Sequence, residues 1–237
     1  MSAGLRIQPA RATLASVVAD KLRRRIVTGQ LRPEVQLRVG ELAQGFDSAI
    51  SPVREALNRL SSEGLVEARD MRGFFVARAS LDELREITGA RCQLNELALR
   101  QAIARGDDDW HNAVRHTYQR LVEAPRRNKS GAASKDWDEA HRAFHRALVA
   151  GCGNRLLVSF CDQLFVKADR YRYLARLSPH ASTHKRDSEH RKIMQAALSR
   201  RSDAAVALLT HHFEATAHLF EAAWTSSSSL GIYALEQ

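Results

Sequence analysis

Four histidines in the C-terminal two thirds of the chain have the spacing and surroundings of a metal site. His141 and His145 stand four residues apart, so one face of a helix would present both imidazoles. His190 and His212 each interrupt a further apolar stripe of helical period. A single histidine on an apolar face is more often a core residue with a hydrogen-bond partner. Four such residues converging from three helices predict a site for a divalent metal.

An arginine occupies a comparable position earlier in the chain. The apolar residues around Arg91 recur at helical spacing and place its side chain inside a predicted bundle. A buried guanidinium needs an anion. Two sources stay open: an internal Asp or Glu, of which Glu96 is near in sequence but off the stripe, or the carboxylate of a bound small molecule.

A second group of polar residues lies in the stretch Ser-Pro-Val-Arg-Glu-Ala-Leu at positions 51–57. Ser51 is a favourable helix N-cap and Pro52 suits the first helical position, so Arg54 would be the third helical residue. A cation there opposes the helix dipole unless the helix end and the guanidinium bind a phosphate together. The polar face of this helix continues with Asn58, and Arg59 lies on its flank.

The surrounding elements predict a winged helix-turn-helix. A helix over about 13–28 comes first, with the apolar stripe Leu14, Val17, Val18, Leu22 and Ile26. A short apolar-periodic segment follows at 39–46, then a tight connection at 47–48 and the helix that ends at Gly64. Residues 65–68 and 74–77 have the pattern of a hairpin whose turn carries Arg72 and Gly73. We therefore predict a DNA-binding domain over residues 10–78.

From Leu81 onward, strand patterns vanish and helical stripes succeed one another. Breaks near residue 106, at 125–131, at 151–154, at 178–179 and near 202 divide this region into about six helices. The fold class predicted for the chain is mainly α: an N-terminal winged helix-turn-helix with a small β-hairpin wing, then an all-α helical bundle over residues 81–224.

Composition limits the partners and the compartment. Lys and Arg number 36 against 27 Asp and Glu, and the resulting charge of +9 suits a polyanion partner, more so in the N-terminal third. Three scattered cysteines do not form a disulfide framework, and neither a signal peptide nor an apolar run of membrane-spanning length is present. We expect a soluble, cytoplasmic protein with no membrane partner.

Taken together, these motifs resemble the GntR transcriptional regulators, in the FadR-type subfamily with an FCD effector domain. The resemblance covers roughly residues 10–224 and rests on the runs 51–60, 63–66 and 72–77, and on Phe144-His145, Gly153-Asn154, Glu189-His190 and His212. It implies a homodimer that binds a palindromic double-stranded DNA operator. The candidate DNA-contacting residues are Ser51, Arg54, Asn58, Arg59, Arg72 and Gly73.

The resemblance also implies a cofactor and an effector. Several proteins of this type bind zinc or nickel through one Asp and three His, and the candidate ligands here are His141, His145, His190 and His212. His141 stands where the aspartate is expected. The site could therefore have four histidine ligands, bind metal more weakly, or bind no metal. Asp138 is a fallback ligand, one helical turn before His141. The implied effector is a small organic acid clamped by Arg91 and Arg172. Gly40 and Ile50 stand where many relatives carry Arg, so the half-site contacts are expected to differ.

We therefore predict a ligand-responsive transcription factor, whose direction, repression or activation, the sequence leaves open. The alternative is a metal-dependent helical-bundle enzyme acting on a small carboxylate. Di-iron bundles use two Glu-x-x-His pairs, and this chain offers only Asp138-x-x-His141. A sequence-independent DNA-packaging protein is a third possibility, but it would have no use for an interior lined with His and Arg.

Overall fold

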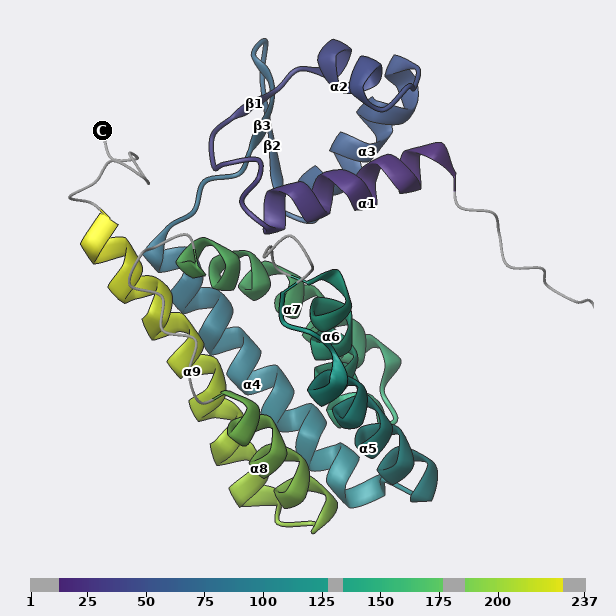
Figure 1. Cartoon of the computed structure of the whole chain (residues 1–237), viewed down its shortest axis with the longest axis vertical. Helices are drawn as coiled ribbons and strands as arrows, with labels where there is room; N and C mark the ends of the chain where they lie inside the picture. Colours follow the sequence, from purple (N-terminus) through teal and green to yellow (C-terminus); the bar gives the residue numbers. More distant parts are fainter. Residues whose placement is uncertain (1–12, 128–133, 177–185, 228–237) are drawn as a thin grey trace, which may run out of the picture. The chain divides into compact units, whose positions relative to one another are not determined.

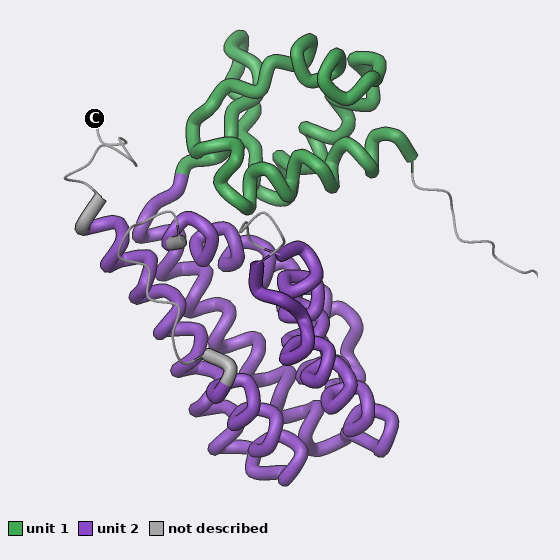
Figure 2. Tube along the Cα trace, viewed as in Figure 1, with its two compact units in different colours: residues 1–78 green, residues 79–237 purple. Residues whose placement is uncertain are grey.

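The computed structural model describes residues 13–127, 134–176 and 186–227, and the chain divides into two compact units, residues 1–78 and 79–237 (Figure 2). Helices dominate both units, and strands occur in the N-terminal one. The mainly α fold class predicted from the sequence is confirmed.

The N-terminal unit is a winged helix-turn-helix (Figure 1). Its elements are α1 (Leu14–Val27), β1 (Gln36–Leu37), α2 (Val39–Gly45), α3 (Ile50–Ser62), β2 (Val66–Arg69) and β3 (Gly73–Val76). The strands form an antiparallel sheet of order β1-β3-β2. The sequence predicted the β2–β3 hairpin but missed β1, because a strand of two residues has no measurable alternation of polar and apolar side chains.

Helix α1 forms where the sequence predicted it, with a different buried face. Thr13 is its N-cap, and the Thr13 hydroxyl accepts a hydrogen bond from the Ser16 amide. The predicted stripe was wrong at its first two positions, since Leu14 and Val17 are 48% and 36% exposed. Ala15 and Ala19 are buried in their place, and these small side chains let α1 approach α3 closely.

Helix α3 begins at Ile50, so the prediction that Ser51 is its N-cap was wrong. Ala49 is the N-cap, with extended backbone and no capping side chain, and Arg54 is therefore the fifth helical residue rather than the third. The Ser-Pro pair allowed both registers, because no amide in the first turn has an intrahelical partner and a proline costs little at any of these positions. The conflict between Arg54 and the helix dipole is weaker than the sequence suggested.

Left-handed backbone occurs at several turns of this unit, and two of them end α3 and form the tip of the wing. Gly64 ends α3 with φ of 74°, and the Leu65 amide donates to the Leu60 carbonyl at 3.0 Å, which is a Schellman cap. In the β2–β3 turn, Gly73 has φ of 89°, and the Gln36 side-chain amide donates to the Arg72 carbonyl at 3.0 Å. Strand β1 thus holds the tip of the wing.

The described residues of the C-terminal unit form six helices, as predicted (Figure 1). They are α4 (Leu81–Arg105), α5 (Asp108–Glu123), α6 (Lys135–Ala150), α7 (Arg155–Arg176), α8 (Arg186–Leu198) and α9 (Ser202–Ser227). Ser80, Asp107 and Ser134 cap α4, α5 and α6 through their side chains. Helix α4 packs against α6, α7, α8 and α9, so residues on its inner face lie at the centre of the bundle.

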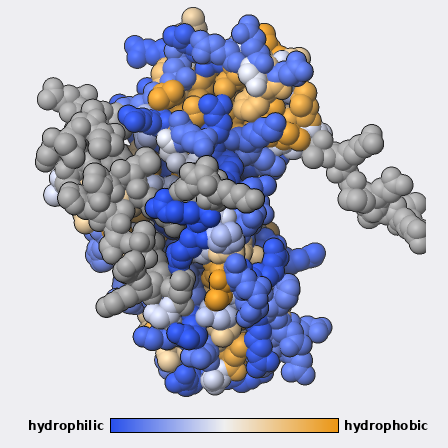
Figure 3. All heavy atoms as spheres, viewed as in Figure 1, coloured by the Kyte–Doolittle hydropathy of each residue, from blue (hydrophilic) through white to orange (hydrophobic). Residues whose placement is uncertain are grey.

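The described surface carries scattered apolar side chains. On the side seen in Figure 3 they gather over the N-terminal unit, whose large exposed apolar residues are Leu14, Val17, Val35, Ile50 and Met71. Within the described ranges, no helix combines the length and the apolar character needed to cross a membrane.

Candidate DNA-contacting face and buried histidine centre

All six candidate DNA-contacting residues are exposed, on α3 and at the tip of the wing: Ser51, Arg54, Asn58, Arg59, Arg72 and Gly73. The buried face of α3 consists of Val53, Ala56, Leu57 and Leu60, each at most 1% exposed. One face of α3 is thus packed in the core, and the opposite face is exposed to solvent. The Arg54 guanidinium makes no hydrogen bond or ion pair with any described residue, so its donors are available to a ligand.

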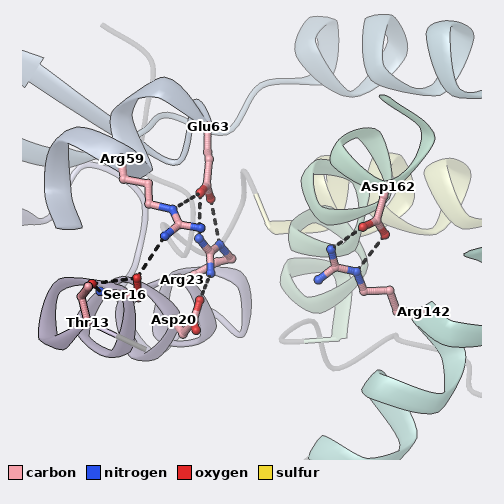
Figure 4. A network of polar contacts seen from close by, with 8 residues as sticks. All are labelled: Thr13, Ser16, Asp20, Arg23, Arg59, Glu63, Arg142 and Asp162. Atoms are coloured by element: carbon pink, nitrogen blue, oxygen red, sulfur yellow. Dashed lines mark hydrogen bonds and ion pairs between the residues drawn. The ribbon is translucent and has the colours of Figure 1, made fainter. Parts of the chain in front are cut away.

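Arg59 differs from Arg54, because a polar network between α1 and α3 restrains it (Figure 4). Its Nε lies 3.6 Å from a Glu63 oxygen, and its Nη1 lies 3.4 Å from the Ser16 hydroxyl. The same Glu63 carboxylate accepts two hydrogen bonds from Arg23, at 2.7 and 2.8 Å. That hydrogen bonding raises the pKa of Arg23 despite partial burial. The sequence analysis missed Arg23 and Glu63, which are 40 residues apart and share no local pattern.

The four candidate histidines converge in the core of the C-terminal unit. Helix α6 supplies His141 and His145, α8 supplies His190 and α9 supplies His212, and all four are buried. One nitrogen from each ring lies within 4.8 Å of the corresponding nitrogen of every other. The His141 Nε2 is 3.2 Å from the Nε2 of His190 and 3.1 Å from that of His145.

These nitrogens cannot satisfy one another. A ring nitrogen carries either a proton or a lone pair, so the His141 Nε2 cannot accept from one neighbour and donate to the other. Protonation is no remedy, because burial and then the neighbouring charges lower the pKa of His141 and His145 well below the ordinary 6.5. One cation could accept lone pairs from all four rings. An all-imidazole set is typical of sites for zinc, copper or nickel, and the residues present therefore fit such an ion.

Different neighbours orient the His212 and His141 rings. Glu189 lies 2.8 Å from the Nδ1 of His212, an arrangement that fixes the tautomer and directs Nε2 toward the cluster. His141 is stacked on Trp137, with ring centroids 4.6 Å apart and planes 15° from parallel. Its Nδ1 is buried and has no hydrogen-bond partner among the described residues. His141 is thus positioned by stacking rather than by a carboxylate.

The fallback ligand Asp138 is not part of this cluster. Its carboxylate accepts hydrogen bonds from the Tyr173 hydroxyl and from the Arg172 Nη2, the latter at 3.1 Å. Because these bonds hold the Asp138 carboxylate, one of them to a buried cation, it is not a metal ligand in this arrangement. The described groups that could hold a metal are therefore the four histidines alone.

Arg91 is buried, as its place in the apolar stripe predicted. Its guanidinium carbon lies 3.7 Å from the centroid of Phe213 and 5.2 Å from that of Phe165, and it makes no hydrogen bond or ion pair with a described residue. Burial lowers its pKa to about 10. Glu96, the internal acid considered above, pairs instead with Arg100 at 2.9 Å. Glu96 is therefore not the anion that balances Arg91.

Arg172 is also buried but, unlike Arg91, has its own carboxylates. Asp169 and Asp138 both pair with it. Burial lowers the pKa of Arg172, but the charges and hydrogen bonds of these two acids outweigh burial and raise it. Only its Nη1 is buried without a hydrogen-bond partner in the described structure.

A cavity of about 20 Å³ joins the two arginines to the histidines. Arg91, Trp137, His141, Arg172, His190 and His212 are among its lining residues. This volume is enough for about one water molecule. The site therefore brings together four histidines that could hold a metal, the Arg91 guanidinium, which has no direct hydrogen bond or ion pair in the described structure, and the Arg172 Nη1.

Sequence reasoning found the histidines and Arg91 but missed what surrounds them. Trp137, Phe213 and Glu189 define the ring stacking, the cation–π contact and the tautomer. The one local signal was the pair Glu189-His190, and its carboxylate bonds His212, on another helix, rather than the histidine beside it.

A winged helix-turn-helix with an exposed arginine on α3, followed by an all-α unit, is typical of DNA-binding regulators. Residues 14–76 match the family model described as bacterial regulatory proteins, gntR family. Residues 86–215 match the model described as FCD domain. The chain belongs to the GntR family and carries an FCD domain.

Named relatives agree with this assignment. The chain is 33% identical over 195 residues to the HTH-type transcriptional repressor GlaR of Escherichia coli, which covers 81% of this chain and 88% of GlaR. It is 31% identical over 208 residues to the uncharacterized HTH-type transcriptional regulator BphR of Paraburkholderia xenovorans, covering 86% of this chain and 84% of BphR. Such regulators bind DNA operators and are not enzymes, so the enzyme alternative is set aside.

Solved structures share the fold at lower identity. E. coli McbR/YncC superimposes with a TM-score of 0.75 at 19% identity and covers 90% of this chain and 100% of its own. A GntR regulator from Rhodococcus gives 0.69 at 21% identity, covering 88% and 98%.

Proposed function

We propose that this regulator is a ligand-responsive repressor. Its homodimer would bind a palindromic operator through α3 and the wing, and a small organic acid in the helical domain (residues 81–224) would change its affinity for DNA. The observation that carries the proposal is Arg91. A buried guanidinium without an acceptor is costly, and a bound carboxylate would remove that cost. Repression is supported by the named repressors among the relatives.

The two arginines would play different parts toward this acid. Asp138 and Asp169 already balance the charge of Arg172, so its buried Nη1 would contribute a directional hydrogen bond. Arg91 makes no direct ion pair, although Asp169 acts on its charge from beyond that distance, so it would supply the main electrostatic attraction for the acid. The aromatic rings of Phe165 and Phe213 beside it would exclude water and so strengthen the ion pair.

We infer that His141, His145, His190 and His212 hold a zinc or nickel ion. Such an ion supplies a Lewis-acidic centre to which an oxygen of the effector can bind. Glu189 would keep the His212 Nε2 unprotonated, and Trp137 would keep the His141 ring in place. The lowered pKa of His141 and His145 keeps these two imidazoles neutral, so their lone pairs are free for coordination.

The small cavity suggests how binding could be coupled to DNA release. A carboxylic acid is larger than one water molecule, so it can enter only if the surrounding side chains or helices move. Arg91 is carried by α4, which begins at Leu81, three residues after the N-terminal unit ends at Arg78. A shift of α4 would alter the spacing of the two recognition helices in the dimer, which must match the half-site spacing of the operator.

The test measures binding of a fluorescent operator duplex by anisotropy while small organic acids are added to zinc-loaded protein. We expect at least one acid to lower the DNA affinity of the wild type and to have no effect on Arg91→Met. Arg100→Met is the matched control, because Arg100 lies on the same helix with an exposed side chain, and it should respond like the wild type. An equal response of Arg91→Met would contradict the assignment. Light scattering on the free protein tests the dimer.

A further inference from the structure

Ile50, the first residue of α3, is exposed at a position where a helix usually presents polar groups. Its side chain is 54% exposed, whereas Val53 and Leu57 of the same helix are fully buried. A single exposed isoleucine is ordinary on a protein surface. Ile50, however, lies on the first turn of the recognition helix, and residues there contact the edges of DNA bases.

The neighbours of Ile50 define a small mixed surface. Arg54 lies four residues later on the same face of α3, and its guanidinium makes no ion pair with a described residue. Ala49 before it and Ser51 after it are small and exposed. Neither neighbour is long enough to cover the Ile50 side chain, so a ligand that contacts Arg54 can also contact Ile50.

The chemistry of the major groove leaves one feature that an isoleucine can recognise. Base edges there present hydrogen-bond donors and acceptors, and the single apolar group among them is the C5-methyl of thymine. The N-terminal residues of a recognition helix are those that contact base edges, while an arginine one turn further can reach a phosphate or a guanine.

We propose that Ile50 determines specificity by packing against the C5-methyl group of a thymine in each operator half-site. This inference rests on the proposed operator binding by α3 and adds the identity of one base. Burying one methyl group contributes about 0.8 kcal/mol, so its loss should weaken binding about fourfold in one half-site and about fifteenfold in both.

The experiment first selects an operator from a random duplex library with the full-length wild-type protein. Each thymine of the selected site is then replaced, symmetrically in both half-sites, by deoxyuridine, which lacks only the methyl group. Affinities are measured for the wild type, Ile50→Ala, Ile50→Val and the control Val122→Ala, an exposed apolar residue of α5 in the C-terminal unit.

We expect one symmetric pair of thymines at which the wild type, Ile50→Val and Val122→Ala each bind the deoxyuridine duplex about fifteenfold more weakly. Ile50→Ala should bind both duplexes equally. The proposal is overturned if no thymine is sensitive, or if Ile50→Ala still discriminates thymine from deoxyuridine. A selection that enriches no sequence would refute operator binding itself and is thereby distinguishable from a failure at Ile50.

Discussion

Replacing His212 by alanine should release the metal, whereas the same replacement at His211 should leave it in place. The two residues are adjacent on α9. His212 is 4% exposed within the histidine cluster, and His211 is exposed and outside it. The effect of this change on the helix itself is therefore common to both variants. His212→Ala also removes a buried ring, so its fold is checked by circular dichroism before its metal affinity is compared.

The expected magnitude follows from the number of ligands. A structural zinc ion is bound with about 10–16 kcal/mol, so one of four ligands contributes about 2.5–4 kcal/mol. His212→Ala should therefore weaken metal affinity by about 10² to 10³-fold. The Glu189 carboxylate that loses its imidazole partner is 28% exposed, so water can solvate it and little further destabilisation is expected.

The assay uses protein purified without an affinity tag, stripped with a chelator and titrated with zinc or nickel against a chromophoric competitor. Elemental analysis of the untreated protein gives the metal content. A companion variant, His141→Asp, places at this position the carboxylate that the family pattern expects, and it should retain the ion. The reasoning is refuted if His212→Ala and His211→Ala bind metal equally well.

Two further predictions concern stability, measured by urea unfolding. A Cβ at Gly106 would lie 2.1 Å from a ring carbon of Trp110, so Gly106→Ala should lose about 1–3 kcal/mol; Gly89→Ala, where no atom lies within 4 Å, should gain up to about 1 kcal/mol. Equal effects at the two glycines would contradict this steric argument. Burial raises the pKa of Asp162, but hydrogen bonds and charge, chiefly from Arg142, outweigh it and hold that pKa below its ordinary value. Asp162→Asn should therefore cost about 1 kcal/mol at pH 7, since the exposed arginine is partly screened. The difference from the wild type should begin to shrink as pH falls below the ordinary value of 3.8, and it should vanish only below the lowered pKa of the native state. A difference that stays constant as pH falls through this range would argue against the ion pair as its cause.

The sequence alone was sufficient for the order and type of the elements. Apolar residues at helical spacing, Gly64 at the end of α3 and the glycine in the wing turn are local signals, because each depends on a few neighbouring residues. The same periodicity placed His141, His145 and Arg91 on buried faces before any contact was known. It predicted that these residues need partners, since burying a polar group without one costs free energy.

Which partners they found was decided by the tertiary structure. Glu189 bonds a histidine on another helix, and Asp138 pairs with Arg172 instead of joining the cluster. Arg91 lies on aromatic rings, and the nearby Asp169 makes no direct ion pair with it. The first residue of α3 was likewise ambiguous, because a Ser-Pro pair suits more than one position of a first turn. The physical reason is common to these cases. Periodicity determines which face of a helix is buried, but the partners on that face come from distant segments, and their distances depend on how the helices pack.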